Sequence, residues 1–165
     1  MKTKSIQSIK GTQDILPDEV HFWQAMERKI FEEMVFFGFS EIRTPAFENT
    51  DLFSRSVGEQ TDIVSKEMYT FEDRSGGSLT LKPEATASVV RAFIQHNLDK
   101  INTLTRLFYI DALFRRERPQ KGRYRQFHQF GAELFGSEHP EADVEIVSLA
   151  SSIFKSIGIN EITLK

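Results

Sequence analysis

The chain of 165 residues contains no cysteine, so disulfide bonds and zinc sites with thiolate ligands are excluded. No apolar run is long enough to cross a bilayer, and the first residues, MKTKSIQSIKG, lack the apolar core of a secretory signal peptide. The sequence also lacks a nucleophile elbow, a glycine-rich phosphate loop before a helix and a spaced set of metal ligands. We therefore expect a cytoplasmic protein without a protein-held metal site.

The chain is rich in phenylalanine and carries one local cluster of positive charge. Fifteen phenylalanines and a hydrophobic content of 39% indicate a folded unit with a real core. The net charge is −3, yet residues 115–125, RRERPQKGRYR, contain six basic side chains and one acidic side chain. Such a short cluster in an acidic chain favours a focused anion site. The alternative is a solvated loop whose arginines pair with Glu117 and other carboxylates.

Apolar periodicity and breaker residues predict the elements of the first half. A helix is expected from Pro17, with Asp18 in its first turn and Gly38 after its end. Its buried stripe is predicted to contain Val20, Trp23, Met26, Ile30, Met34 and Phe37. A short strand over Ser40–Thr44, stopped by Pro45, should precede a helical turn over Asp51–Ser56.

The second half is expected to contain two pairs of neighbouring strands and two helices. Residues 68–82 predict a hairpin, in which Tyr69, Phe71, Leu79 and Leu81 face one side. A helix should follow over Pro83–Asn97, then strands over Arg106–Arg116 and Gln126–Phe135. Pro140 should begin a last helix that ends at Gly158 and buries Val147, Ala150, Ile153, Phe154 and Ile157. The final residues, 161–165, suggest a strand cut at the chain end. Hairpins that do not alternate with helices predict an α+β fold, an antiparallel sheet flanked by helices.

The unit from Arg106 to Phe135 is the candidate site. Arg115 and Arg123 could each bind an anion, and Phe127 could stack on a base. Period-two alternation places Gln129, Gly131 and Glu133 on one face of the second strand, and His128 on the other. Glu84 and Thr86, taken alone, are ordinary residues for the start of a helix.

These residues resemble a known family. FRRERPQKGRYRQFHQFGAELFG, residues 114–136, resembles the second signature motif of class II aminoacyl-tRNA synthetases in its histidyl form. Three further segments agree in order: IKGTQDILP at 9–17, FSRSVGEQTDIVSKEMYTFEDRSG at 53–76 and LTLKPEATASVVRA at 79–92. Pro45 resembles the proline of the family's first motif, whose helix and strand form the dimer interface. Residues 1–165 thus look like the amino-terminal portion of a class II catalytic domain.

The resemblance implies a role for each matching side chain. Glu84, Thr86 and Gln129 would hold the α-amino group of histidine, and Glu133 would accept a hydrogen bond from the imidazole. Arg115, the catalytic residue, would bridge the histidine carboxylate and the α-phosphate of ATP. The remaining ATP-binding residues would be Glu117 and Phe127 at the adenine, Arg123 at the γ-phosphate, and Tyr124 in the same loop. Mg²⁺ would accompany the ATP.

The resemblance also implies the activity and the partners. A histidine-tRNA ligase activates histidine to histidyl-adenylate with ATP and transfers it to tRNA(His), and the family works as a homodimer. The third motif and the anticodon-binding domain are expected beyond Lys165, so this chain alone should be weakly active or inactive. The main alternative is a non-catalytic regulatory subunit of ATP phosphoribosyltransferase with the same fold. A simple nucleic-acid-binding module using the basic loop is a second alternative.

Overall fold

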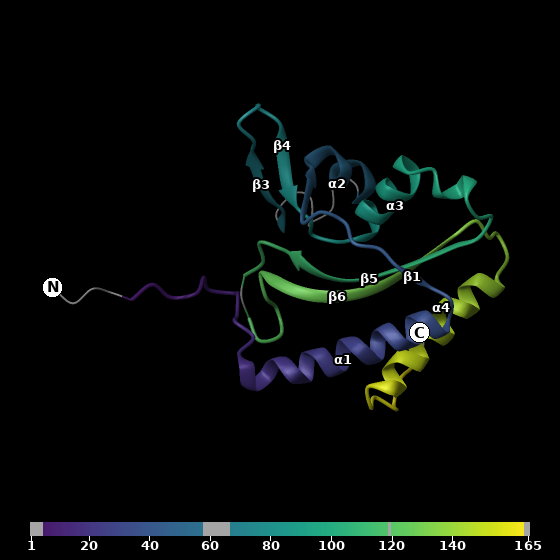
Figure 1. Ribbon diagram of the computed structural model, residues 1–165. Helices are drawn as coiled ribbons and strands as arrows, with labels where there is room; N and C mark the ends of the chain where they lie inside the picture. Colours follow the sequence, from purple (N-terminus) through teal and green to yellow (C-terminus); the bar gives the residue numbers. More distant parts are fainter. Residues whose placement is uncertain (1–4, 58–66, 119, 164–165) are drawn as a thin grey trace.

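The computed structural model describes residues 5–57, 67–118 and 120–163. A long antiparallel pair of strands forms its middle layer (Figure 1). Helices α1 (Pro17–Phe36) and α4 (Glu141–Ser156) cover one face of this layer. Helix α3 (Thr86–Gln95) and a second, smaller sheet with helix α2 (Thr50–Val57) lie on the other side. The α+β arrangement expected from the sequence is confirmed.

The middle layer is a sheet of three strands in the order β1-β5-β6. Strands β5 (Thr105–Phe114) and β6 (Gln126–Phe135) pair antiparallel along their whole length. Strand β1 (Ser40–Glu41) is shorter than predicted and pairs with β5 in parallel. The sheet is therefore mixed. The long connection from β1 to β5, which contains the second sheet, α2 and α3, permits this parallel pairing. Ile42 still donates to the Phe108 carbonyl at 2.8 Å before the chain leaves the sheet.

The predicted hairpin forms a separate antiparallel sheet, in the order β2-β4-β3. It consists of β2 (Phe47–Asn49), β3 (Tyr69–Glu72) and β4 (Ser78–Leu81). Tyr69 pairs with Leu81 and Phe71 with Leu79, so the four apolar side chains share one side as predicted. Residues 58–66 of the matched segment 53–76 lie outside the described residues.

Helix α1 begins at Pro17, and Gly38 follows its end with a φ of 80°, as the sequence predicts. Only the second half of its apolar stripe is deeply buried, at Ile30 and Met34. The predicted burial of Val20 and Met26 is wrong, since these side chains are 36% and 37% exposed. The reason is the position of α4, which contacts α1 near Lys29 and Glu33.

Helices α3 and α4 differ from their predictions at three points. Helix α3 begins at Thr86, three residues later than expected, and is followed by the short helix η2 (Leu98–Lys100). Helix α4 begins after Pro140 and ends before Gly158, but Val147 is 40% exposed and Leu149 is buried in its place. The predicted final strand is wrong over residues 161–163, which form no strand, and residues 164–165 are not described.

Strand β5 is buried on both faces and separates two apolar clusters. On the α1 and α4 side, Phe108 packs with Ile30, Met34, Phe39, Leu149 and Ile153. On the α3 side, Leu107, Tyr109 and Leu113 pack with Ala85 and Val89. Burial of each large apolar side chain stabilises the fold by roughly 1.5–3 kcal/mol. The second cluster fixes the start of α3 over one face of the β5–β6 pair.

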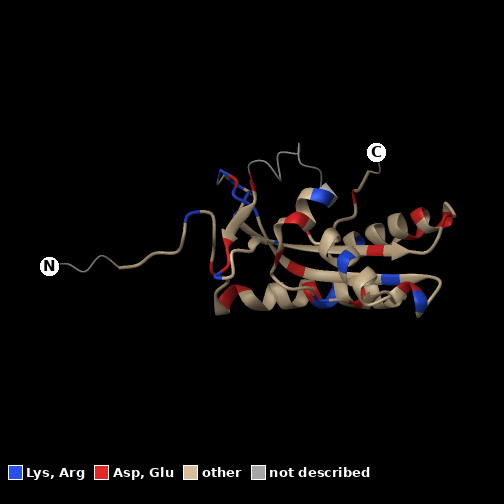
Figure 2. Cartoon of the chain, turned by 90° about the horizontal axis from the view of Figure 1, so that it is seen from above, with Lys and Arg blue, Asp and Glu red and all other residues tan. Residues whose placement is uncertain are grey.

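Charges of both signs occur along the helices and strands (Figure 2), in keeping with 21 basic and 24 acidic residues. Within the described ranges, no helix is both long enough and apolar enough to span a membrane.

Candidate active site

One face of β6 carries the polar residues that the sequence singled out. Gln129, Gly131 and Glu133 lie opposite Asp111, Tyr109 and Leu107 of β5 in the antiparallel register. Paired residues of an antiparallel ladder point to the same face. Leu107 and Tyr109 pack against the start of α3, so this face is the one that α3 covers. The predicted common face of the three β6 residues is therefore the floor of the candidate site.

The start of α3 places two further polar side chains above this floor. The Glu84 carboxylate accepts a hydrogen bond from the backbone N–H of Ala87 at 3.0 Å, a capping interaction at the helix N-terminus. The hydroxyl of Thr86, the first residue of α3, donates to the carboxylate of Glu133 at 2.7 Å. The structure thus brings Glu84, Thr86 and Glu133 together from segments almost fifty residues apart.

Glu133 lies in an environment that disfavours its charged form. Burial raises the pKa of its carboxyl group above the ordinary 4.5, and the nearby charge of Glu84 acts in the same direction. The hydrogen bond from Thr86 opposes these effects by stabilising the carboxylate. Two carboxylates close together in a half-buried site favour a ligand with a positive or hydrogen-bond-donating end.

Tyr109 is a site residue that the sequence reasoning missed. It is only 4% exposed, and its ring lies directly over Gly131. A Cβ atom at Gly131 would come within 2.3 Å of the Tyr109 hydroxyl oxygen, so the phenol occupies the space above this glycine. The pKa of Tyr109 is raised, mainly by burial and also by the nearby charge of Glu133. Hydrogen bonds with the Thr86 and Gln129 side chains act in the opposite direction but do not cancel this effect. A glycine in the middle of a strand was the available signal for a close approach.

Arg115 lies just beyond the end of β5 and is fixed by three contacts. Its Nε–H donates to the Pro83 carbonyl at 2.9 Å, immediately before Glu84. Its guanidinium carbon lies 5.1 Å from the centroid of the Phe127 ring, in cation–π distance. Its backbone N–H donates to the Arg125 carbonyl at 2.9 Å, which closes the base of the loop. The arginine thereby connects the α3 turn with the basic loop.

The loop between β5 and β6 folds back on itself. Arg123 forms an ion pair with Glu117 at 3.3 Å, and the Arg125 side chain donates to the Glu117 carbonyl at 3.4 Å. This pairing agrees with the alternative interpretation of the basic cluster, a solvated loop whose arginines pair with Glu117 and other carboxylates. The Arg123 side chain is nevertheless 62% exposed. Tyr124 in the same loop is 40% exposed. The Arg125 N–H donates to the Gly11 carbonyl, so the segment before α1 runs along the loop (Figure 1).

The candidate residues form two neighbouring groups. Glu84, Thr86, Gln129 and Glu133 surround Tyr109, whereas the second group contains Arg115, Glu117, Arg123, Tyr124 and Phe127. Phe127 lies two residues before Gln129 on the same face of β6, about 7 Å along a strand. Arg115 contacts Phe127 and Pro83 and so lies where the two groups meet. An amino acid and a nucleotide bound to the two groups would meet at Arg115.

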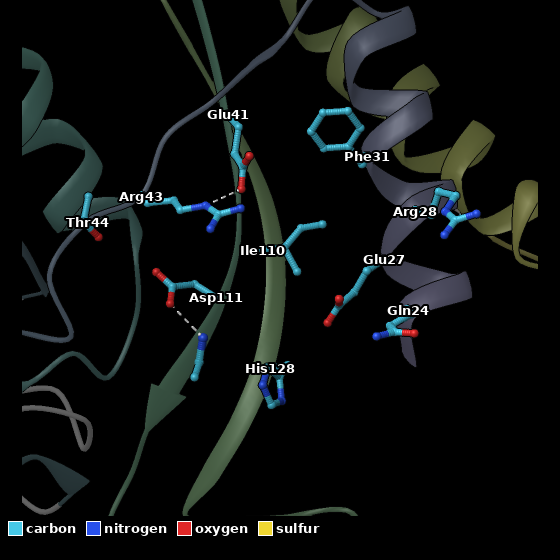
Figure 3. A pocket seen from close by; sticks show the side chains of 11 residues that line it. Gln24, Glu27, Arg28, Phe31, Glu41, Arg43, Thr44, Ile110, Asp111 and His128 are labelled. Atoms are coloured by element: carbon cyan, nitrogen blue, oxygen red, sulfur yellow. Dashed lines mark hydrogen bonds and ion pairs between the residues drawn. The ribbon is translucent and has the colours of Figure 1, made fainter. Parts of the chain in front are cut away.

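A cavity of about 660 Å³ lies elsewhere, between α1 and β5 (Figure 3). His128 lines it from the face opposite Gln129 and packs against Trp23, with ring centroids 5.0 Å apart. The predicted position of His128, on the face opposite Gln129 and Glu133, is confirmed. This cavity shares Asp111 with the polar face but contains none of the predicted binding residues.

The fold and the site define a class of protein. Solved histidyl-tRNA synthetase structures share this fold, which is that of the class II aminoacyl-tRNA synthetases. The apo histidyl-tRNA synthetase of S. aureus superposes with a TM-score of 0.79 at 41% sequence identity, over 93% of this chain and 35% of that chain. A Bacillus halodurans protein described as an ATP phosphoribosyltransferase regulatory subunit/histidyl-tRNA synthetase superposes with a TM-score of 0.81 at 26% identity, over 97% and 40%.

Sequence comparison narrows the class to one family. The profile of the histidyl-tRNA synthetase family matches residues 11–165. The histidine–tRNA ligase of Solibacter usitatus is 55% identical over 158 residues, which are 94% of this chain. The chain belongs to the histidyl-tRNA synthetase family. It spans 37% of the length of that relative.

Proposed function

We propose that this chain supplies the amino-terminal part of the active site of a histidine-tRNA ligase, which forms histidyl-adenylate from histidine and ATP. The observation that carries the proposal is the bond between Thr86 and Glu133, which joins the start of α3 to the polar face of β6. Arg115 lies at the end of this face and contacts both the α3 turn and Phe127. Family membership agrees with the proposal.

Histidine would bind between α3 and β6 through its two polar ends. The α-amino group would donate to Glu84, Thr86 and Gln129, which are acceptors or can act as acceptors. The imidazole would donate to Glu133, whose half-buried carboxylate is well suited to a hydrogen-bond donor. The Tyr109 phenol would lie between the two ends, because it covers Gly131 between Gln129 and Glu133.

ATP would bind along the second group of residues. Phe127 would stack on the adenine and Glu117 would accept from its amino group, while Arg123 would leave Glu117 to reach the γ-phosphate, with Tyr124 beside it. The described residues include no group of three or more histidine or acidic side chains that could hold a metal ion. Mg²⁺ would enter bound to the phosphates of ATP, whose negative charge it would reduce.

In the proposed reaction, a carboxylate oxygen of histidine attacks the α-phosphorus of ATP and the bond to pyrophosphate breaks. This displacement needs alignment and charge neutralisation rather than a protein nucleophile. Arg115 would supply both, because its planar fork can bridge the carboxylate and the α-phosphate. A terminal ribose hydroxyl of tRNA(His) would then attack the histidyl carbonyl carbon and release AMP. We place this enzyme in the cytoplasm as a homodimer.

A regulatory subunit of ATP phosphoribosyltransferase is the alternative with the same fold. The Bacillus halodurans protein whose description includes that role is 26% identical to this chain, whereas the S. aureus synthetase is 41% identical. The chain also keeps Arg115, Glu117, Arg123, Gln129 and Glu133 together, a set that a non-catalytic subunit does not require. Both observations favour the ligase.

Histidine-dependent exchange of pyrophosphate into ATP tests the proposal in the full-length protein that carries this sequence. We predict that Arg115→Ala lowers the exchange rate by about 100-fold or more, the scale of losing a donor to the transition state. Arg118→Ala, in the same loop and exposed, is the matched control and should stay within about twofold of wild type, because it lies outside both groups of residues. Near-normal exchange by Arg115→Ala, or no exchange by the wild type, would contradict the proposal.

A further inference from the structure

One lysine is buried at the turn that leads into α3. Lys82 is 1% exposed, and it is the only lysine among the buried residues of the described chain. Removing an ammonium group from water is costly unless it is paired and hydrogen-bonded. A lysine at such a position therefore indicates a specific set of partners rather than simple filling of the core.

The ammonium group of Lys82 joins two segments that flank the site. It forms an ion pair with Asp111 of β5 and donates to the Thr44 carbonyl oxygen at 3.1 Å. The Thr44 hydroxyl oxygen is a weaker third partner at 3.4 Å. Thr44 belongs to the link between β1 and β2, and both partners line the cavity of Figure 3. Lys82 thus lies between that cavity and the face of the β5–β6 pair that α3 covers.

The backbone of Lys82 adds two more links to the same segments. Its N–H donates to the Ala46 carbonyl at 3.0 Å, next to Thr44 in the link before β2. Its carbonyl accepts from the N–H of Phe114 at 3.0 Å, at the end of β5. The side chain and the backbone of Lys82 therefore both connect this residue to β5 and to the β1–β2 link.

Residues 82–85 belong to no helix or strand, so contacts of this kind determine their path. Within this short turn, the Pro83 carbonyl accepts from Arg115, and the Glu84 carboxylate caps α3. Thr86 follows at once and donates to Glu133. A displacement of Lys82 would therefore move the groups proposed to hold the α-amino group and the carboxylate of histidine. Displacements of about 1 Å can change catalysis by two orders of magnitude.

We propose that Lys82 is a positioning residue for histidine, which acts through the 82–86 turn and its anchors Asp111 and Thr44. This inference rests on the proposed ligase function. Lys82 is not one of the residues proposed to contact histidine or ATP, and its side-chain partners, Asp111 and Thr44, do not include the loop residues proposed for ATP, Glu117 and Arg123. Its loss should therefore affect the use of histidine more than the use of ATP.

A purely structural role makes a different prediction. Replacing a buried ion pair by neutral groups is often tolerated, whereas removing one partner leaves an unpaired charge and is strongly destabilising. The informative variant is therefore the double change Lys82→Met with Asp111→Asn, which removes both charges. Lys82→Arg, which keeps the charge, is the conservative companion. Arg106→Met, which breaks the Arg106–Glu145 ion pair of 2.5 Å near α4, is the matched control.

The experiment is pyrophosphate exchange by the full-length protein, with the KM for histidine and the KM for ATP measured separately. For the double variant we expect the histidine KM to rise by about tenfold and the ATP KM to stay within about twofold. Lys82→Arg should restore the histidine KM to within about threefold of wild type. Arg106→Met should lower the melting temperature and leave both KM values unchanged. If the double variant fails to fold, Thr44→Val, which removes only the hydroxyl partner at 3.4 Å and keeps the ion pair, should give a smaller increase in the histidine KM and leave the ATP KM unchanged.

Three results would overturn the inference while leaving the ligase function in place. They are a histidine KM that stays at the wild-type value, equal increases in both KM values, and an arginine variant as impaired as the double variant. A wild-type protein without histidine-dependent exchange would instead overturn the proposed function itself.

Discussion

Glu133 shows how one residue can be prepared for its ligand by its neighbours. Its carboxylate is half-buried, accepts from Thr86 at 2.7 Å and lies near the charge of Glu84. The raised pKa follows mainly from burial, so the folded protein holds a proton on this group more tightly than an unfolded chain does. A hydrogen-bond donor from a ligand would relieve that penalty, which is the physical basis for assigning Glu133 to the imidazole.

The raised pKa predicts a pH-dependent contribution to stability. A carboxyl group whose pKa is raised on folding adds stability that is complete below its unfolded value, near 4.5, and is lost as the pH rises through the folded value. Glutamine at this position keeps an acceptor for Thr86 but does not titrate. Relative to Glu133→Gln, the wild type should therefore lose unfolding free energy between pH 4 and pH 7.5. Urea denaturation at the two pH values measures this difference, and a gap that is constant or grows with pH would refute the assignment.

Much of the site at the residue scale follows from period-two alternation. It places Gln129, Gly131 and Glu133 on one face and His128 on the other, as found. Tyr109 could not be assigned in the same way, because its position over Gly131 depends on the register between two strands. The Thr86–Glu133 bond is likewise a long-range contact that local sequence does not specify.

At the scale of the elements, the glycines after β6 and within the basic loop have different constraints. Gly136 follows β6 and has a φ of 94°, and a Cβ atom there would lie 1.9 Å from the Thr103 carbonyl oxygen. Gly122, in the loop between β5 and β6, has a φ of 79° and no atom within 4 Å of its Cβ position. Both positions require a left-handed backbone, but only Gly136 also requires the absence of a Cβ atom.

This difference predicts two distinct losses of stability. Gly122→Ala should cost about 1 kcal/mol of unfolding free energy, the backbone cost alone. Gly136→Ala should cost about 1–3 kcal/mol more, because the loop before β5 must move away from the new methyl group. Chemical denaturation of the two variants checks the prediction. Equal losses would mean that the approach of Thr103 to Gly136 is not a feature of the protein in solution.

The elements themselves were largely predictable where local signals are strong. Pro17 and Gly38 mark the ends of α1, and the Ser-Gly-Gly turn marks the β3–β4 hairpin. The errors concern relations between distant elements: the parallel pairing of β1, the separation of the two sheets, and the exposure of Val20 and Val147. These features depend on which element covers which surface, and periodicity within a single segment carries no such information.

At the scale of the whole molecule, the chain is an assembly of three layers that brings three segments to one place. The 82–86 turn, the end of β5 and the face of β6 meet at Arg115, with α1 and α4 supporting the sheet from behind. Because the chain spans 37% of the Solibacter relative, the complete activity is assigned to the full-length protein that carries it. The proposed activity of that protein requires histidine to bind on this face of β6.

The most direct test of histidine binding on this face is the KM for histidine of the Glu133→Ala variant, measured by pyrophosphate exchange in the full-length protein. We predict an increase of about 10- to 100-fold, the cost of losing a hydrogen bond to a charged group, with the KM for ATP within about twofold of wild type. Glu138→Ala, an exposed carboxylate just after β6, is the matched control and should change neither value. A histidine KM for Glu133→Ala equal to that of the wild type would contradict the account.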